Sequence, residues 1–171
     1  VQYADAPAMG QIEIIKTDSE TGEPLEGAEF TVTAAEDITT PDGTVHAAAG
    51  DVVDTVVSGK NGTATSKNLY LGKYTVTETK QPAGYVLPDQ TWEVELTYED
   101  QNTELVTETL EVENNTTVVI IDKKVTGSEQ RLSGVKFAIW NKDTEDPVDP
   151  GMTYKDIYKT DREGQIHLEK F

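Results

Sequence analysis

The 171-residue chain contains no cysteine, which excludes disulfide bonds as a source of stability. Aromatic residues make up only 7% of it, and 14 basic residues stand against 32 acidic ones, for a formal net charge of −18. A surface this acidic repels nucleic acids and anionic membranes, so neither is expected as a partner. No apolar run approaches the roughly 20 residues that a membrane helix needs, and no signal peptide stands at the start. We therefore expect a mature or excised piece of a protein, without membrane insertion in this segment.

The residues that are present favour an all-β protein. Valine, threonine and glycine are plentiful, whereas helical runs rich in leucine or alanine are absent. Short apolar runs separated by turn sequences at this spacing are typical of a β-sandwich. The turn sequences are "PDG" at 41–43, "KNG" at 60–62, "PAGY" at 82–85 and "EDQN" at 99–102.

A gapless internal repeat divides the chain. "IEIIKTDSETGEPLEGAEF" at 12–30 matches "VIIDKKVTGSEQRLSGVKF" at 119–137, with a lysine, a leucine, a glycine and a phenylalanine at the same spacing in both. The offset between the copies is the size of a domain rather than of a solenoid repeat. We therefore expect tandem β domains with almost no linker: a leader or linker at 1–9, a complete domain at 10–117 and the N-terminal part of a second domain at 118–171.

The second copy is incomplete. "YKTDREGQIHLEKF" at 158–171 resembles "VVSGKNGTATSKNL" at 56–69, and the later strands of the first copy have no counterpart. Two explanations stay open at this point: the second domain was truncated or cleaved, or a partner strand completes it in trans.

Strand parity predicts that one lysine points inward. Alternate side chains of a strand lie on opposite faces of a sheet, and Lys16 shares its face with the isoleucines at 12 and 14. The repeat decides which face is buried, because that face is again apolar before Lys123, whereas Ile15 on the other face is replaced by Asp122. Lys16 is therefore expected on the inner face.

The same parity places a glutamate and an asparagine on inner faces. Glu78 ends the row that holds Tyr74 and Val76, and Asn114 shares its face with the apolar residues at 110 and 112, while Asn115 points away. Each residue has an ordinary alternative: the lysine extends to water, the glutamate is solvated at a strand end, and the asparagine begins a turn. Three inward polar residues on three strands together suggest a reactive site.

An amine, a carboxamide and a carboxyl group in an apolar pocket can form an amide. Burial disfavours charge, so it lowers the pKa of a lysine and raises the pKa of a glutamate. Lys16 would then be a neutral nucleophile, Asn114 the electrophile, and Glu78 the acid that polarises the amide and moves protons as ammonia leaves. Fixed positioning gives effective molarities of roughly 10⁵ to 10⁸ M, which makes a poor electrophile usable for one turnover.

Three motifs carry a family resemblance: "IIKTDSETGEPLEGAEF", "LYLGKYTVTETKQPAGY" and "LEVENNTTVVIIDKK". With them, residues 10–171 resemble the Cna protein B-type domains of Gram-positive surface proteins and the SpaA-like pilins. The middle motif is similar to the pilin E-box, Tyr-x-x-x-Glu-Thr-x-x-Pro-x-Gly-Tyr. Its positions are filled by Tyr74, Glu78, Thr79, Pro82, Gly84 and Tyr85.

The resemblance implies a fold and a role. The fold is an Ig-like, prealbumin-like β-sandwich, in two tandem domains of which the second is incomplete. The resemblance also implies a spontaneous isopeptide bond between Lys16 and Asn114, with Glu78 as the catalytic acid; in the second domain only the cross-link lysine, Lys123, is matched. The implied role is a structural stalk module of an extracellular, cell-wall-anchored pilin or adhesin, with the anchor outside this segment. The implied partners are neighbouring domains of the same surface protein or pilus.

Other functional classes are also considered. The segment 34–57 is long for a plain stalk domain and could form an extra hairpin or a loop that binds a host extracellular protein or glycan. A turnover enzyme is not expected, because the only histidines, His46 and His167, fall in different domains without a recognisable nucleophile motif. No cofactor and no metal site is expected.

Overall fold

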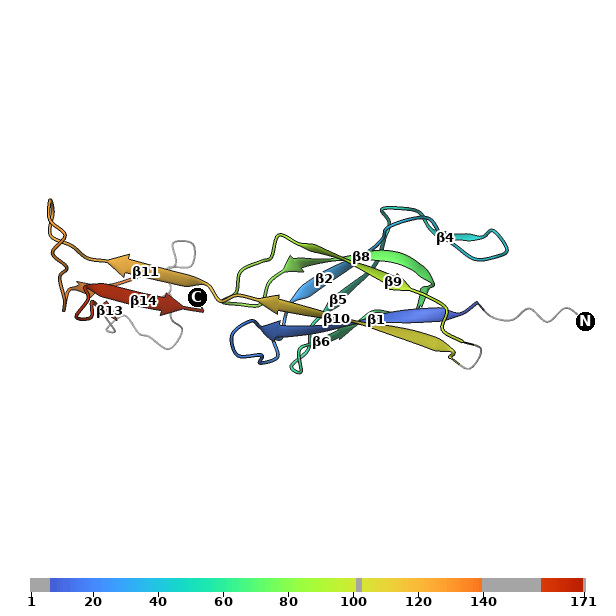
Figure 1. Cartoon of the computed structure of the whole chain (residues 1–171), viewed down its shortest axis with the longest axis horizontal. Helices are drawn as coiled ribbons and strands as arrows, with labels where there is room; N and C mark the ends of the chain where they lie inside the picture. The colour runs from blue at the N-terminus through green and yellow to red at the C-terminus, as the bar shows by residue number, and fades with distance from the viewer. Residues whose placement is uncertain (1–6, 101–102, 140–157, 171) are drawn as a thin grey trace, which may run out of the picture. The chain divides into compact units, whose positions relative to one another are not determined.

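The computed structural model describes residues 7–100, 103–139 and 158–170, and every regular element in these ranges is a β-strand (Figure 1). Across the same ranges no helix has the length and apolar character to cross a membrane. The chain divides into two compact units, Val1–Asn115 (unit 1) and Thr116–Phe171 (unit 2). The assignment of these units to a complete and an incomplete domain remains a prediction.

Unit 1 is built from two sheets and a small hairpin. One sheet has the strand order β10-β1-β6, with β7 also pairing β1; the other has the order β5-β2-β8-β9; and β3 pairs β4. The strands are β1 (Met9–Asp18), β2 (Glu29–Ala34), β3 (Ile38–Thr39), β4 (Val45–Ala47), β5 (Val52–Val57), β6 (Thr63–Thr65), β7 (Leu69–Tyr70), β8 (Gly72–Lys80), β9 (Thr91–Leu96) and β10 (Leu105–Asn114).

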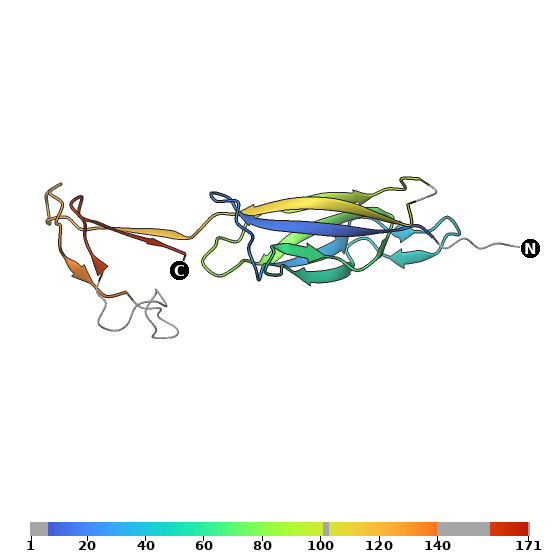
Figure 2. The same ribbon diagram turned by 90° about the horizontal axis from the view of Figure 1, so that it is seen from below.

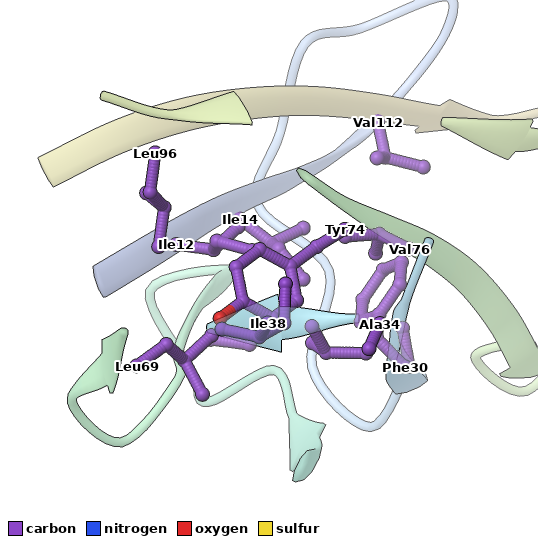
Figure 3. Packing of buried hydrophobic residues seen from close by; sticks show 13 residues of the cluster. Ile12, Ile14, Phe30, Ala34, Ile38, Leu69, Tyr74, Val76, Leu96 and Val112 are labelled. Atoms are coloured by element: carbon purple, nitrogen blue, oxygen red, sulfur yellow. The ribbon is translucent and has the colours of Figure 1, made fainter. Parts of the chain in front are cut away.

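The two sheets pack face to face around one apolar core (Figure 3). Alternation of buried and half-buried residues along β1 and β2 gives each strand one inner face, as expected when a pleated strand covers a core. Isoleucines of β1 meet Tyr74 and Val76 of β8 and Phe30 of β2 in this core. The arrangement confirms the predicted all-β sandwich.

The first and last strands of unit 1 pair in parallel. β1 and β10 are in register from Met9 opposite Leu105 to Asp18 opposite Asn114, and the two strands run side by side in both views (Figures 1 and 2). Parallel neighbours cannot be joined by a tight turn, and here nearly the whole of unit 1 lies between them. The pairing therefore brings the predicted lysine and asparagine to the same end of one sheet.

Unit 2 repeats the backbone pattern of the first half of unit 1. It holds β11 (Val118–Asp122), β12 (Lys136–Phe137), β13 (Tyr158–Lys159) and β14 (Gln165–Glu169), with β11 paired to β14 and β12 paired to β13. The same two backbone hydrogen bonds surround the lysine in each unit. In unit 1, Lys16 N–H donates to Gly62 O and Leu25 N–H donates to Lys16 O. In unit 2, Lys123 N–H donates to Gly164 O and Leu132 N–H donates to Lys123 O.

The turn that accepts the hydrogen bond from the lysine N–H requires a glycine in both units. Gly62 and Gly164 have φ of 75° and 72°, a region that residues with a side chain rarely adopt. A Cβ at Gly62 would lie 2.5 Å from the carbonyl oxygen of Lys16, and one at Gly164 would lie 3.0 Å from that of Lys123. In both units, therefore, the glycine turn lies in close contact with the backbone of the lysine.

Candidate functional site

Lys16 is completely buried near the end of β1. Its strand alternates half-buried and buried residues over its whole length, and the Lys16 side chain is 0% exposed. The Nζ atom donates hydrogen bonds to the backbone oxygens of Thr17 and Val112, each at 3.1 Å. Because Val112 is the partner of Lys16 across the parallel ladder, the amine reaches β10 two residues before Asn114.

Glu78 and Asn114 meet in the same buried region. Glu78 lies near the end of β8 and Asn114 is the last residue of β10, and both are 2% exposed. The Nδ2 atom of Asn114 donates a hydrogen bond of 2.7 Å to Oε1 of Glu78. In the described part of the chain, Oε2 of Glu78 and Oδ1 of Asn114 have no hydrogen-bond partner. All three predicted residues therefore lie in the interior, on three different strands.

Burial shifts the protonation of the lysine and the glutamate in opposite directions. Loss of hydration lowers the pKa of Lys16 from 10.5, although the negative charges of Glu78, Glu113 and Asp18 partly oppose this shift. Loss of hydration raises the pKa of Glu78 from 4.5, partly opposed by the hydrogen bond from Asn114 and the charge of Lys16. Both shifts favour the neutral forms, an amine and a carboxylic acid.

Asp18 is a buried acid that the sequence analysis missed. It is 2% exposed, and its Oδ2 accepts a 2.8 Å hydrogen bond from the hydroxyl of Tyr85, the last residue of the E-box-like motif. The available signal was parity, because Asp18 follows Lys16 by two residues and so shares its inner face. The partner Tyr85 could not be read from the sequence, since it belongs to a turn that only the tertiary fold brings to β1.

Lys123 occupies the matching position in unit 2 but a different environment. Its backbone makes the same two hydrogen bonds as that of Lys16, yet its side chain is half-exposed. No glutamate or asparagine of the described residues bonds to its amine. The structure thus brings together the lysine, acid and amide of unit 1, whereas in the described part of unit 2 only the lysine has a counterpart.

A cavity lies beside the segment 34–57. That segment forms the β3–β4 hairpin, which projects from the sandwich in Figure 1, and the edge strand β5. The cavity has a volume of about 390 Å³ and lies between the hairpin, the start of β5 and residues 67–70. The ring of His46 stacks on that of Tyr70 with centroids 3.6 Å apart, so the hairpin is packed against the domain.

A family model described as "SpaA: Prealbumin-like fold domain" matches residues 10–112. This range includes Lys16 and Glu78 and ends two residues before Asn114. No curated protein sequence matches the chain.

Several solved structures are similar to the chain. The TIE protein of Bacillus anthracis is 24% identical over 95% of this chain and 26% of its own, with a TM-score of 0.53. The fimbrial protein FimP of Actinomyces oris is 19% identical over 64% of this chain and 30% of its own, with a TM-score of 0.50. The group B streptococcus pilus 2b backbone protein is 30% identical over 63% of this chain and 41% of its own, with a TM-score of 0.46. The chain thus spans less than half the length of each, and the first two likenesses establish the fold.

Proposed function

The chain belongs to the SpaA prealbumin-like fold domain family, and from this premise we propose that unit 1 is a structural stalk module of a Gram-positive pilin or surface adhesin. In this proposal an isopeptide bond between Lys16 and Asn114 fastens the first strand of the unit to the last. The observation that carries the proposal is the buried cluster itself, in which Asn114 contacts Glu78 at 2.7 Å and the Lys16 amine already contacts β10.

The reaction is a transamidation with balanced protons. The neutral Nζ of Lys16 attacks Cγ of Asn114, the new C–N bond forms, and the bond from Cγ to Nδ2 breaks. One proton of the amine ends on the departing nitrogen, which leaves as ammonia. Glu78 donates its proton to the amide as the tetrahedral intermediate forms and recovers one as it collapses, so the acid is unchanged.

The contact between Glu78 and Asn114 is suited to both steps. A half-turn of the carboxamide about its last bond exchanges Oδ1 and Nδ2, since this torsion is roughly two-fold. Protonated Glu78 would then donate to Oδ1 across the same short contact and polarise the carbonyl group. The absence of a second partner for Oε2 of Glu78 in the described chain supports the neutral acid, because an unpaired buried carboxylate oxygen is costly.

The bond would stabilise the unit and protect it from tension. It closes a loop of roughly 100 residues, which by analogy with disulfides contributes roughly 4 to 5 kcal/mol in the chain-entropy model. Tension entering before Lys16 and leaving after Asn114 would bypass nearly all the strands between them. Resistance to force and to proteases is what a stalk on a cell surface requires.

Intact mass tests the proposed bond. The folded 171-residue chain should be lighter than its sequence mass by one ammonia, and Lys16→Met, Asn114→Ala and Glu78→Ala should each restore the full mass. Lys60→Met and Asn68→Ala are matched controls, because both residues are exposed, and they should retain the deficit. A wild-type chain at its full sequence mass would rule out the bond.

The proposal extends to the rest of the chain and its setting. Residues 10–117 would be a complete domain and 118–171 the N-terminal part of a second, with Lys123 as its cross-link lysine; the matching backbone hydrogen bonds of the two units support this. The expected location is the extracellular surface, with neighbouring domains of the same protein or pilus as partners. Apart from its one self-directed reaction, the unit would not act as an enzyme.

A second candidate function is ligand recognition through residues 34–57. The cavity of about 390 Å³ favours it, since ligand sites are typically clefts of roughly 300 to 1,000 Å³. Ile38 and Leu69 line the cavity with apolar surface, and Lys67 and Asn68 line it with polar groups. Binding to arrays of host matrix proteins or glycans that disappears when the β3–β4 hairpin is shortened, with the mass deficit retained, would establish this function; absence of binding to any array would exclude it.

A further inference from the structure

Four polar residues form a connected group at the end of unit 1, next to the reacting side chains. They are Asp18, Ser19, Tyr85 and Asn115, and we call them the end clamp. Asp18 and Tyr85 are 2% and 8% exposed, and they share the 2.8 Å hydrogen bond described above. The other carboxylate oxygen of Asp18 accepts backbone hydrogen bonds from Glu20 and Thr21, at 2.9 and 3.0 Å. The carboxylate is therefore held rigidly at the end of β1.

The end clamp joins β1 to the residues around Asn114. The backbone N–H of Ser19 donates to the carbonyl oxygen of Asn114 at 3.1 Å, and the Ser19 hydroxyl donates to Oδ1 of Asn115 at 2.7 Å. Both bonds lie immediately beyond the last pair of the β1–β10 ladder, Asp18 opposite Asn114. They continue the pairing of the two strands past the proposed electrophile, Asn114, by one residue.

The end clamp also joins both strands to the turn that follows Glu78. Tyr85 and Val86 belong to this turn, which leaves β8 at Lys80. Tyr85 reaches Asp18 through its hydroxyl, and Val86 N–H donates to the carbonyl oxygen of Asn115 at 2.9 Å. The strands that carry the lysine, the acid and the amide are thus tied together at one end by side-chain and backbone hydrogen bonds of residues that do not react.

We propose that the end clamp positions Asn114 and Glu78 against Lys16 for the cross-linking reaction. This inference rests on the isopeptide bond proposed above and assigns a role to residues that the bond itself does not need. The reaction depends on near-contact of the attacking nitrogen and the amide carbon, and small displacements from such an arrangement slow a reaction strongly. Asp18, Ser19, Tyr85 and Asn115 are therefore positioning residues, and none of them touches the new bond.

The charge of Asp18 distinguishes positioning from electrostatic assistance. Three acids act on Lys16, namely Glu78, Glu113 and Asp18, and all of them raise its pKa. The Asp18 carboxylate thus favours the unreactive ammonium form and works against the reaction. Its burial beside the nucleophile is explained by the bonds it makes, not by its charge.

The test compares tyrosine variants of the full chain. Each chain is made by cell-free translation, translation is stopped, and the fraction lacking one ammonia is followed by intact mass over time. Tyr85→Phe removes only the hydroxyl that reaches Asp18, and cross-linking should slow about tenfold, equivalent to about 1.4 kcal/mol in the barrier. Tyr98→Phe is the matched control, because Tyr98 is 56% exposed, and it should react at the wild-type rate.

A second variant separates shape from charge. Asp18→Asn keeps a side chain of the same size that can still accept the two backbone bonds, but it removes the negative charge. Since that charge raises the Lys16 pKa, the acid limb of the rate against pH should move to lower pH, and the reaction should still go to completion. A residue with only a general structural role would lower the rate equally at every pH.

Hydrogen exchange keeps the inference testable apart from the bond. In a Lys16→Met background, where no cross-link can form, Tyr85→Phe should increase exchange at the amides of Ser19 and Val86, the donors to Asn114 and Asn115. Equal rates and equal exchange for Tyr85→Phe and wild type would overturn the positioning role. A wild-type chain that never loses ammonia would instead overturn the proposed bond, and the exchange result alone would then decide whether the end clamp holds these strands together.

Discussion

Lys16 and Lys123 have the same backbone environment and different side-chain environments. Each donates its N–H to the carbonyl of a glycine turn and accepts a hydrogen bond from a leucine nine residues later. The Lys16 side chain is fully buried, whereas that of Lys123 is half-exposed. Local sequence therefore places the lysine, and burial of its amine depends on strands that come from farther along the chain.

In unit 1 those strands are β8 and β10. They contribute Glu78 and Asn114 together with Val76 and Val112, which cover the inner face of the sandwich. The described residues of unit 2 supply two two-stranded sheets, and Val119, which by strand parity shares its face with Lys123, is 40% exposed. A neutral lysine needs both the local loop and the covering strands, and among the residues that the structure describes only those of unit 1 supply both.

The largest expected effect is on stability, from removing one lysine or the other. Lys16→Met abolishes the proposed bond and should lower the free energy of unfolding of unit 1 by roughly 4 to 5 kcal/mol, a fall in Tm of about 20 °C or more. Methionine fills a similar volume, so packing is retained. Lys123→Met should change stability by no more than about 0.5 kcal/mol, because the side chain of Lys123 is only half-buried and substitutions near the surface usually have effects of this size. Calorimetry measures both, and equally small effects would contradict the proposed role of Lys16.

A second effect of the same bond is mechanical. When the chain is pulled from its two ends, wild-type unit 1 should not lengthen between Lys16 and Asn114. Asn114→Ala should release about 100 residues, an extension of about 330 Å at the contour length of an extended chain. Single-molecule force spectroscopy measures this step, with Asn68→Ala as a control that should behave as wild type. A wild-type step of the full length would exclude the cross-link.

The sequence predicted the buried positions of the lysine, the glutamate and the asparagine because their signals were local. Strand parity placed Glu78 and Asn114 inward, and for Lys16 the internal repeat resolved the ambiguity that Ile15 creates. The parallel pairing of β1 with β10 could not be predicted in the same way, because it depends on how the sheet closes rather than on any short pattern. The inward position of Asp18 was within reach of the same parity argument, but Asp18 is the last residue of β1 and a turn at 19–21 follows it directly, which concealed the position.

Contacts between turns were beyond the reach of the sequence. Tyr85 is 67 residues from Asp18, and no periodicity connects a turn to a distant strand end. Asn115 was expected to point away from the inner face; it is exposed, yet it bonds to both Ser19 and Val86. Likewise the segment 34–57 was expected to form a hairpin or a loop, but the stacking of His46 on Tyr70 depends on tertiary packing.

A smaller effect is expected from removing a buried hydroxyl group that occupies the equivalent position in each unit, Ser58 in unit 1 and Thr160 in unit 2. Ser58 Oγ donates to Leu25 O at 2.7 Å and accepts from Ala28 N at 3.0 Å. Thr160 Oγ1 makes the matching bonds in unit 2, to the carbonyl of residue 132 at 2.7 Å and from the N–H of residue 135 at 2.9 Å.

Removing either hydroxyl should cost about 1 to 3 kcal/mol within its own unit, because it leaves buried backbone groups without a partner. Ser58→Ala should increase hydrogen exchange at the amide of Ala28, and Thr160→Ala should increase it at the amide of Val135, because each amide loses its acceptor. The exposed Thr65 provides a control in Thr65→Ala. Exchange that rises in unit 1 but not in unit 2 would mean that the second unit does not hold this loop in the same way.

The last expected effect is the pH dependence of cross-linking in unit 1. The reactive amine fraction rises with pH up to the pKa of Lys16, which burial lowers from 10.5. The protonated acid fraction falls as pH rises above the pKa of Glu78, which burial raises from 4.5. The rate should therefore rise and then fall with pH, changing about tenfold per pH unit, or about 1.4 kcal/mol, on each limb. Because burial moves the two pKa values toward each other, the pH range of fastest cross-linking lies between the two ordinary pKa values.

Intact mass after cell-free synthesis at a series of pH values measures this profile, and the two lysines provide the comparison. Lys123→Met should leave the profile unchanged, because Lys123 takes no part in the reaction of unit 1. A rate that keeps rising through the alkaline range would show that Glu78 does not act in its protonated form. A rate independent of pH on the acid side would show that Lys16 does not have to lose a proton before it attacks, and the neutral pair would then be a consequence of burial without a role in the reaction.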